Sequence, residues 1–483
     1  MIYDTAIIGG GVSGAATAWW LSRYETNTVL LEKNADVGFG VSKANSGIVH
    51  GGFHHPVSSL KAQLELRGNL MFEQLRHELG FPFERNGILV AAFSEEEMTT
   101  VRKLYEQGVA NGVHDLEMCG RERMLELEPK LNSDVVGGFF VPGGGTVEPY
   151  CYVFSLMESA IGNGVDLRCG FEVVSGTYQD GLWTLQSADG RKIQARYVVN
   201  AAGLYADQVS RSCGAENFTI VPRKGEEYLL DRTCAGRPSR VIFPVPSKHS
   251  KGVLVIPTAG GTTMIGPTAE IVDEKDDTAT TAGNQKRILS MVRNMINGIS
   301  ERDCITAFAG LRPVLAESED FYIAPSEKVP CFIQVAGIQS PGLTASPAIG
   351  EYVKDLLKKS GLILAEKSQI KYFLPARHTA RESSLAQLDK LHAENPAWTH
   401  IVCRCEKISE AEVVEAVRRG HTTVDGVKFY TRAGMGRCQG GFCSTGILQI
   451  ISRESGIPMT ELTKRGPGST LLAGKLGDLE VKA

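Results

Sequence analysis

The sequence predicts an α/β protein. We expect a Rossmann-like nucleotide-binding domain interleaved with a sheet-containing α+β substrate domain, followed by a small helical C-terminal domain. Three observations lead to this prediction. The chain begins with a strand, a glycine-rich turn and a helix; two later segments run from a strand into a turn of small residues; and four cysteines are grouped in the last fifth of the chain. A length of 483 residues allows two or three domains.

The N-terminal element spans residues 4–33 and is typical of strand, turn, helix and strand. Its turn fits G-x-G-x-x-G: Gly9 permits the tight turn, Gly11 lets the backbone approach a pyrophosphate, and Gly14 lets the helix pack on the strand. The helix N-terminus offers N–H groups to a phosphate, and Glu32 offers a carboxylate to ribose hydroxyls. This context predicts a bound dinucleotide; the alternative is a glycine turn that binds no ligand.

Two later segments are expected to complete the same domain. Residues 195–209 run from an apolar strand into a small-residue turn, and residues 331–357 form a strand, a glycine-rich turn and a helix. The positive N-terminus of that helix suits a flavin ring, which gains negative charge on reduction.

Five segments carry a resemblance to a known superfamily: "NSGIVHGGFHHPVSSLKA" (45–62), "GTVEPY" (145–150), "VVNAAG" (198–203), "GLRPV" (310–314) and "SPGLTASPAIGEYV" (340–353). They resemble the D-amino-acid-oxidase-like FAD enzymes, in particular L-2-hydroxyglutarate dehydrogenase and the large subunit of anaerobic glycerol-3-phosphate dehydrogenase. The resemblance covers residues 1 to about 360 and identifies the substrate poorly. It implies FAD as cofactor, with the binding residues Gly9, Gly11, Gly14, Glu32, Lys33, Ser46, Gly47, Val173, Ala202, Gly203, Gly337, Gly342, Leu343 and Thr344.

The expected domain boundaries follow from these segments. FAD-binding parts are expected at about 1–80, 145–215 and 330–360, and substrate-domain parts at about 80–145 and 215–330. Residues 361–398 are expected to form a connector, 399–456 a cysteine-bearing domain and 457–483 a tail.

The chemistry expected beside the flavin is oxidation of an alcohol, which requires a base for the hydroxyl proton as hydride leaves carbon. Histidine is the usual base near neutral pH, and His50, His54 and His55 follow the segment expected to contact the flavin. We expect at least one of them to be catalytic. The alternative is that one packs against the flavin while the others face solvent.

An anionic substrate needs a cationic anchor, and arginine can hold a carboxylate or phosphate with two parallel hydrogen bonds. Arg312 resembles the substrate-side arginine of the glycerol-phosphate family, and Lys224 occupies a position that is basic in both families. Lys61 and Arg223 are weaker candidates, and a surface charge is the alternative for each.

The chain also departs from both families. His54 and His55 stand where the glycerol-phosphate enzymes carry Arg-Tyr. Leu254 stands where the hydroxyglutarate enzymes carry a histidine, for which His249 is a candidate substitute. The identity of the substrate therefore stays open.

The grouped cysteines have the spacing C-x-C, thirty-two residues, then C-x4-C; they are Cys403, Cys405, Cys438 and Cys443. Two predicted helices, the first capped by Ser409, bring the two cysteine loops together. Four thiolates suit zinc or an iron–sulfur cluster. The spacing resembles the bacterioferritin-associated ferredoxin family, which implies a [2Fe–2S] cluster; zinc and a site without metal are the alternatives.

Four basic residues near the cysteines have two interpretations. They offset the cluster's negative charge and dock an acidic partner, or they form a solvated rim. They are Arg404, Lys407, Arg432 and Arg437.

Together these features predict an FAD-dependent dehydrogenase that oxidises a secondary alcohol of a small anionic metabolite, either glycerol 3-phosphate or a 2-hydroxy acid such as L-2-hydroxyglutarate. Its electrons would pass through [2Fe–2S] to a partner flavoprotein or iron–sulfur subunit. The alternatives are oxidation of an amino or imino acid, and a non-catalytic electron-transfer subunit.

The composition argues against other classes. A net charge of −4 gives no footprint for nucleic acid. No stretch approaches the roughly 18 apolar residues of a membrane span, and the first strand begins by Tyr3, which leaves no room for a signal peptide. We expect a cytoplasmic protein that meets membranes only peripherally or through a partner.

Overall fold

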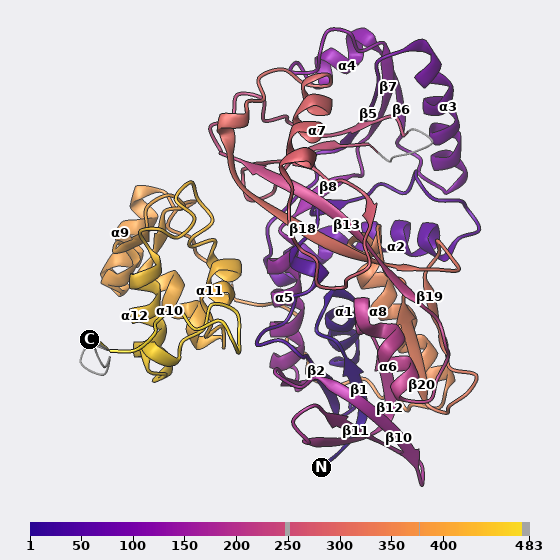
Figure 1. The fold of residues 1–483 in the computed structure, drawn as a ribbon, viewed down its shortest axis with the longest axis vertical. Helices are drawn as coiled ribbons and strands as arrows, with labels where there is room; N and C mark the ends of the chain where they lie inside the picture. The colour runs from indigo at the N-terminus through magenta and orange to yellow at the C-terminus, as the bar shows by residue number, and fades with distance from the viewer. Residues whose placement is uncertain (247–251, 376, 476–483) are drawn as a thin grey trace, which may run out of the picture. The chain divides into compact units, whose positions relative to one another are not determined.

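The computed structural model describes residues 1–246, 252–375 and 377–475, and it forms two compact units (Figure 1). Unit 1 contains Met1–Glu32 and Gly38–Leu374, and unit 2 contains Lys33–Val37 and Pro375–Ala483. A short N-terminal segment therefore belongs to the C-terminal unit, which no sequence pattern indicated. Within the described ranges, no helix is long and apolar enough to cross a membrane.

The first sheet of unit 1 has eight strands. Its parallel centre runs β9–β2–β1–β12–β20, and an antiparallel meander leads from β10 through β11 into β12. Ile8 lies in register with Leu31 and Asn200, so the turns after β1, β2 and β12 meet at one edge. The strands are β1 (Ile2–Ile8), β2 (Thr28–Leu31), β9 (Asp166–Arg168), β10 (Val173–Gln179), β11 (Leu182–Ser187), β12 (Lys192–Asn200), β19 (Tyr322–Pro325) and β20 (Phe332–Ala336).

Helices pack against one another beside this sheet (Figure 1). α1 (Val12–Leu21) packs against α5 (Pro149–Gly162) and α8 (Gly342–Lys359), and α8 packs against α2 (Leu60–Leu79). A Cβ at Gly350 of α8 would lie 2.6 Å from the Ala16 carbonyl oxygen of α1, so glycine lets the two helices touch. The short α6 (Ala206–Ser212) packs near β10 and β20.

The second sheet of unit 1 has nine strands in the order β17–β13–β16–β15–β14–β5–β7–β6, with β18 paired along β13. One face packs against α4 (Arg121–Leu127) and α7 (Ala282–Arg293), and the other against α3 (Glu95–Ala110) and the segment that contains Ile48 and Phe53. The strands are β5 (Ile88–Ala92), β6 (Glu117–Gly120), β7 (Gly137–Val141), β13 (Ile220–Leu230), β14 (Val241–Pro244), β15 (Leu254–Pro257), β16 (Thr263–Gly266), β17 (Glu270–Ile271) and β18 (Cys304–Leu315).

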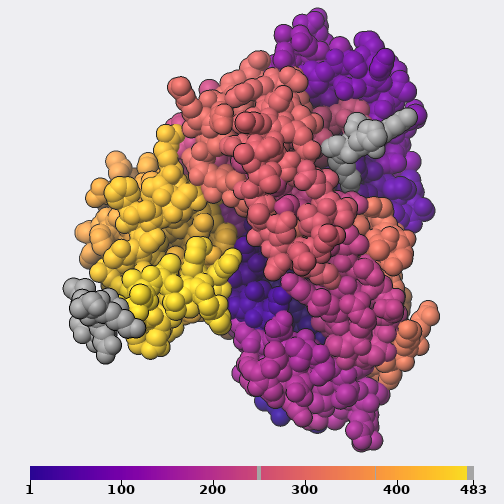
Figure 2. All heavy atoms as spheres, in the orientation of Figure 1, coloured from indigo at the N-terminus to yellow at the C-terminus, as the bar shows by residue number. Residues whose placement is uncertain are grey.

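A third, small sheet of unit 1 consists of β3 (Ile48–Val49), β8 (Gly145–Val147) and β4 (Phe83–Glu84). In the space-filling view, most of the visible surface of unit 1 comes from the middle of the chain, coloured magenta to salmon (Figure 2). The N-terminal strands contribute little to that surface, which agrees with the complete burial of β2.

Short 3₁₀ helices occur in both units: η1 (Val41–Lys43), η2 (Gly203–Tyr205) and η3 (Glu301–Asp303) lie in unit 1, and η4 (Pro396–Trp398) and η5 (Met459–Glu461) lie in unit 2.

Unit 2 is mainly helical. Its elements are α9 (Leu385–Glu394), β21 (Ile401–Cys403), β22 (Ile408–Ser409), α10 (Glu410–Arg418), α11 (Val424–Thr431) and α12 (Ser444–Ser455). The capping box between Ser409 and Glu412 starts α10 as expected. The sequence pattern predicted α10 and α12 but not α11. The region beyond residue 456 is not only a tail, because Leu462 is buried.

The segment Lys33–Val37 is held in unit 2 by a buried polar contact. Asp36 Oδ2 lies 2.6 Å from His421 Nδ1, and both side chains are buried. Asp36 also accepts a hydrogen bond from the backbone N–H of Val37. The chain therefore passes from Glu32, which follows β2, directly into a segment that belongs to unit 2.

Candidate active site and cysteine cluster

The glycines of the first turn have separate structural roles. Gly9 has φ of +108°, and a Cβ there would lie 2.4 Å from the Ala201 carbonyl oxygen. A Cβ at Gly14 would lie 2.0 Å from the Gly9 carbonyl oxygen. By contrast, a Cβ at Gly11 would meet only Ser42 Oγ, at 3.3 Å. Packing alone therefore requires Gly9 and Gly14, whereas Gly11 keeps the N-terminus of α1 accessible, as a bound pyrophosphate needs.

The acidic residue after β2 stabilises this turn. Glu32 is buried, and its Oε2 accepts a hydrogen bond of 2.7 Å from the Gly10 N–H. A carboxylate has two oxygens and several acceptor positions, so this bond is compatible with a second one to a ribose hydroxyl. Lys33, also expected to contact FAD, is exposed and belongs to unit 2.

The turn after β12 lies beside the first turn, because the Ala201 N–H donates to the Ile8 carbonyl at 2.9 Å. Ala202 precedes η2, and Gly203 has φ of +57° with no atom within 4 Å of an added Cβ. Val173 begins β10 and is buried in the core of the first sheet. Its burial is explained by that core, so contact with an adenine stays a prediction.

The segment after η1 is joined to the start of α8 by direct hydrogen bonds. The His50 N–H donates to Thr344 Oγ1 at 2.9 Å, and the Thr344 hydroxyl donates to the Ile48 carbonyl at 3.2 Å. His50 Nε2 lies 3.4 Å from Ser340 Oγ. The structure thus brings His50 to the first turn of α8, where the sequence placed the flavin.

The other residues expected around the flavin follow the same path. Gly47 has φ of +64°, and a Cβ there would lie 2.5 Å from the Val147 carbonyl oxygen. Gly337 has φ of +69° and follows β20. Gly342 donates its N–H to the Gln339 carbonyl at 2.6 Å, and Leu343 lies half-buried in the first turn of α8.

His54 and His55 contact other parts of the protein than His50 does. Their rings pack edge to face with centroids 5.3 Å apart, and His54 packs in the same way on Phe53. The carbonyl of His55 accepts a hydrogen bond of 2.9 Å from Asn111, at the end of α3. These contacts join the pair to α3, whereas His50 is joined to α8.

Arg312 lies on β18, on the face of the second sheet that packs against the flavin-side segment. Its Nη2 donates to the Thr268 carbonyl at 2.6 Å, and the absence of a side chain at Gly225 leaves room for the guanidinium. Burial lowers the pKa of Arg312, while the charge of Glu227 raises it. Arg312 stays cationic because a guanidinium does not lose its proton in proteins.

The register separates Lys224 from Arg312. Arg312 lies directly opposite Arg223, and Lys224 lies opposite Leu311, so alternation places the two candidate anchors on opposite faces. Lys224 is buried on the side of α7 and forms an ion pair of 2.7 Å with Asp277. The hydrogen bond from Lys224 lowers the pKa of Asp277. The structure therefore does not bring Lys224 to Arg312.

The two weaker candidates form ion pairs and hydrogen bonds at one acidic loop. Arg223 Nη2 lies 2.9 Å from Glu319 Oε1, and Gln339, next to Ser340, donates to Glu319 Oε2 at 3.0 Å. Lys61 is buried and donates to the Glu319 carbonyl. Leu254 is buried in β15, and His249 lies outside the described residues.

The four grouped cysteines converge as two pairs. Cys405 Sγ lies 3.6 Å from Cys438 Sγ, and Cys403 is hydrogen-bonded to Cys443, which lowers the pKa of Cys403 to about 6. Two pairs of thiolates suit a cluster with two irons.

The glycine-rich loop directs backbone N–H groups at the sulfurs. Gly434 and Glu406 donate to Cys403, and Phe442, Gly440 and Gly441 donate to Cys438. Such bonds stabilise thiolate charge, so the donor set and its surroundings fit a sulfur-ligated cluster.

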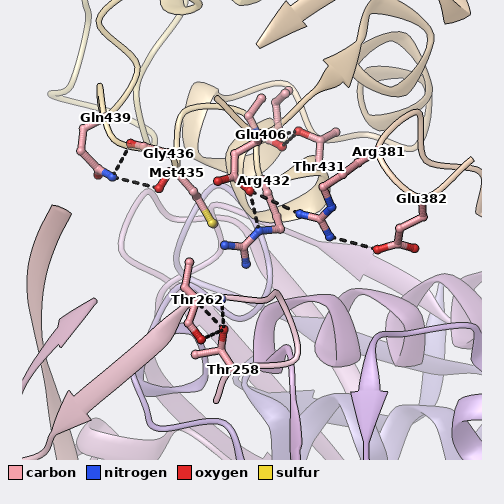
Figure 3. Close-up of polar contacts among 12 residues, drawn as sticks. Thr258, Thr262, Arg381, Glu382, Glu406, Thr431, Arg432, Met435, Gly436 and Gln439 are labelled. Atoms are coloured by element: carbon pink, nitrogen blue, oxygen red, sulfur yellow. Dashed lines mark hydrogen bonds and ion pairs between the residues drawn. The ribbon is translucent and has the colours of Figure 1, made fainter. Parts of the chain in front are cut away.

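A buried ion-pair network centres on Glu406, the residue after Cys405 (Figure 3). Glu406 is 2% exposed, and its Oε2 lies 3.1 Å from Arg432 Nε and 3.4 Å from Arg381 Nη1. Gln439 donates to the carbonyls of Met435 and Gly436, both at 3.0 Å. Arg432 is therefore part of an internal network and not of a solvated rim. Arg404, Lys407 and Arg437 are exposed.

Sequence reasoning missed three residues of these sites. Glu227 contacts Ser46, Ser340 contacts His50, and Glu406 neutralises Arg432. The signal for Glu406 was its position next to Cys405. No pattern in the sequence distinguished Glu227 from Glu226.

Comparison with known proteins gives matches for both units. Residues 4–356 match the family model described as FAD dependent oxidoreductase (DAO), and residues 401–453 match the BFD-like [2Fe-2S] binding domain. A glycerol 3-phosphate dehydrogenase of Caloramator mitchellensis is 41% identical over 476 residues, which cover 98% of each chain.

More distant relatives match a smaller share of the chain. A mitochondrial L-2-hydroxyglutarate dehydrogenase of Arabidopsis thaliana is 25% identical over 72% of this chain and 82% of that protein. The solved structure of dithionite-reduced L-alpha-glycerophosphate oxidase from Mycoplasma pneumoniae with FAD bound is 30% identical. It has a TM-score of 0.74 and covers 78% of this chain and 100% of that one.

Proposed function

Because the chain belongs to the DAO family of FAD-dependent oxidoreductases and carries a BFD-like [2Fe–2S] binding domain, we propose that it is a glycerol 3-phosphate dehydrogenase. Family membership confirms the expected α/β fold class and both expected cofactors, FAD and [2Fe–2S]. The observation that carries the substrate is the alignment with the Caloramator mitchellensis enzyme, which extends over the cysteine-bearing unit as well.

The residues of unit 1 supply binding and proton transfer. When bound, FAD accepts a hydride from carbon, and [2Fe–2S] carries single electrons. The turn at Gly11 and the N-terminus of α1 hold the pyrophosphate. His50 Nε2 takes the proton of the substrate hydroxyl, and Ser340 Oγ orients the imidazole ring from 3.4 Å. Arg312 holds the phosphate.

A second candidate substrate is a 2-hydroxy acid. Its carboxylate has the planar geometry that an arginine fork recognises, so Arg312 would serve it equally well. The L-2-hydroxyglutarate dehydrogenase relatives favour this reading, although their alignment covers less of the chain.

The cysteine cluster provides the proposed route for electrons to leave. Cys405 is exposed, and Phe442, next to Cys443, is 90% exposed. Three basic residues share this exposed region: Arg404, Lys407 and Arg437. This composition suits an acidic flavoprotein or iron–sulfur protein as partner, because an exposed aromatic ring anchors an interface and opposite charges speed encounter.

Anaerobic bleaching of the bound flavin tests the function. Glycerol 3-phosphate, L-2-hydroxyglutarate and glycine are added separately to the holoenzyme, and the absorbance of oxidised flavin is followed. Rapid bleaching by glycerol 3-phosphate alone is expected. Bleaching by the hydroxy acid alone would select the second candidate, and bleaching by glycine alone would indicate C–N oxidation. No bleaching by any of a broad panel would favour a non-catalytic subunit.

A further inference from the structure

We infer that Glu227 is a positioning residue of the oxidation site, which fixes the Ser46 hydroxyl and sets the net charge around the Arg312 guanidinium. The inference rests on the proposed function, because it requires an anionic substrate at Arg312. It adds a carboxylate to a site for which only cationic and imidazole groups were expected.

Strand alternation places Glu227 on the flavin side of the second sheet. On β13, Tyr228 and Leu230 belong to the core against α7, whereas Leu229 packs with the core that contains Ile48 and Phe53. Glu227 therefore lies on the same face as Leu229. Arg312 pairs with Arg223, which precedes Glu227 on β13 by an even number of residues. Because residues two apart on a strand share a face, Arg312 lies on the same face as Glu227.

The contacts of Glu227 join the two expected parts of the site. Its Oε1 accepts a hydrogen bond from Ser46 Oγ, in the segment expected beside the flavin. Its Cγ lies 3.0 Å from the position of a Cβ on Gly266, so the end of β16 packs closely against the Glu227 side chain. Glu227 is 2% exposed, and a carboxylate so buried is retained only if neighbouring groups compensate it.

Glu226, the adjacent residue, shows what a purely structural acid looks like in this sheet. It is fully buried and accepts hydrogen bonds from Thr281 N at 2.8 Å and Asn284 Nδ2 at 2.7 Å, at the start of α7. It therefore stabilises the helix N-terminus on the opposite face. The pair offers a matched comparison, because both acids are buried neighbours and only Glu227 faces Arg312.

The pKa of Glu227 lies close to neutral pH, so its charge changes within the range that the enzyme meets. Burial raises the pKa of Glu227 to about 7, against the lowering effects of the Ser46 hydrogen bond and the Arg312 charge. Arg312 and Ser46 are the groups that act on Glu227 across the site; Arg223 acts on Arg312 from the same face, and Lys224 lies on the other.

Binding of an anion should therefore depend on this carboxyl. Below its pKa, Glu227 is neutral and Arg312 presents a full positive charge to the substrate. Above the pKa, the carboxylate cancels part of that charge and weakens anion binding. By linkage, a bound anion raises the pKa of Glu227, so binding takes up a proton.

The test compares the pH dependence of KM for glycerol 3-phosphate in three holoenzymes: wild type, Glu227→Gln and the control Glu226→Gln. Dividing each wild-type KM by the variant KM at the same pH cancels the ionisation of the substrate. The ratio of the wild-type KM to the Glu227→Gln KM should rise about sixfold between pH 6.5 and 8.5, the change expected when anion binding raises the pKa of Glu227 by one unit from about 7. The ratio of the wild-type KM to the Glu226→Gln KM should stay constant. The KM of Glu227→Asp should rise with pH as the wild-type KM does.

A ratio to Glu227→Gln that stays constant, with turnover intact, would overturn the inference and leave the proposed function standing. Absence of glycerol 3-phosphate oxidation by the wild type would instead overturn the function. If Glu227→Gln does not fold, proton uptake decides: sulfate, a dianion throughout this range, is titrated calorimetrically into wild-type holoenzyme at pH 8 in two buffers. Uptake of roughly half a proton is expected, and zero uptake would refute the role of Glu227.

Discussion

Replacing Arg312 by lysine tests the proposed anchor without removing its charge. The Arg312 guanidinium donates to the Thr268 carbonyl from Nη2 and shares a face with Glu227, so the rest of the fork is directed at the substrate in our proposal. Lysine keeps the charge but cannot form two parallel bonds to a phosphate. Loss of one charge-assisted hydrogen bond costs about 1.5–3 kcal/mol, which corresponds to roughly a 10- to 150-fold rise in KM.

The measurement is steady-state oxidation of glycerol 3-phosphate with an artificial one-electron acceptor, under nitrogen. KM should rise by that factor while kcat changes less than about threefold, because the lost contact exists before the transition state. Lys224→Met is the matched control and should leave KM nearly unchanged, since Lys224 faces α7 and pairs with Asp277. An unchanged KM in Arg312→Lys, or a large rise in Lys224→Met, would refute the assignment of the anchor to this face.

Three further outcomes are expected. His50→Asn should slow anaerobic flavin bleaching by about 10²- to 10⁴-fold at unchanged FAD content; bleaching within threefold of wild type would exclude His50 as the base. Gly11→Val should abolish FAD binding but leave the fold intact by circular dichroism, because the new Cβ meets only the Ser42 hydroxyl; full flavin content would show that the pyrophosphate lies elsewhere. Cys405→Ser should lose iron and acid-labile sulfide while glycerol 3-phosphate still bleaches the flavin; retention of a complete cluster would remove Cys405 from the ligand set.

Local chemistry made part of the protein predictable from its sequence. The first turn follows from three glycines whose spacing is fixed by close backbone contacts at Gly9 and Gly14. The start of α10 follows from the Ser409–Glu412 capping box. The approach of the two cysteine loops to each other was expected from the two predicted helices, whereas the pairs that the cysteines form were not.

Features that depend on strand register could not be predicted from the sequence. Glu226 and Glu227 are identical residues side by side, and only the pairing of β13 with β18 and the two cores shows which one faces Arg312. The same register places Lys224 on the face opposite to Arg312. Arg432 resembled a rim residue because its partner, Glu406, is twenty-six positions away in the chain.

The bond between Asp36 and His421 spans 385 positions, and this has a consequence for biosynthesis. A ribosome releases the first nucleotide-binding strands long before it makes the imidazole that Asp36 requires. Until then, Asp36 in the nascent chain lacks the His421 side chain that it contacts in the folded protein. The last hundred residues are thus tied to a segment near the N-terminus, and a chain truncated before them would leave Asp36 without the imidazole of His421.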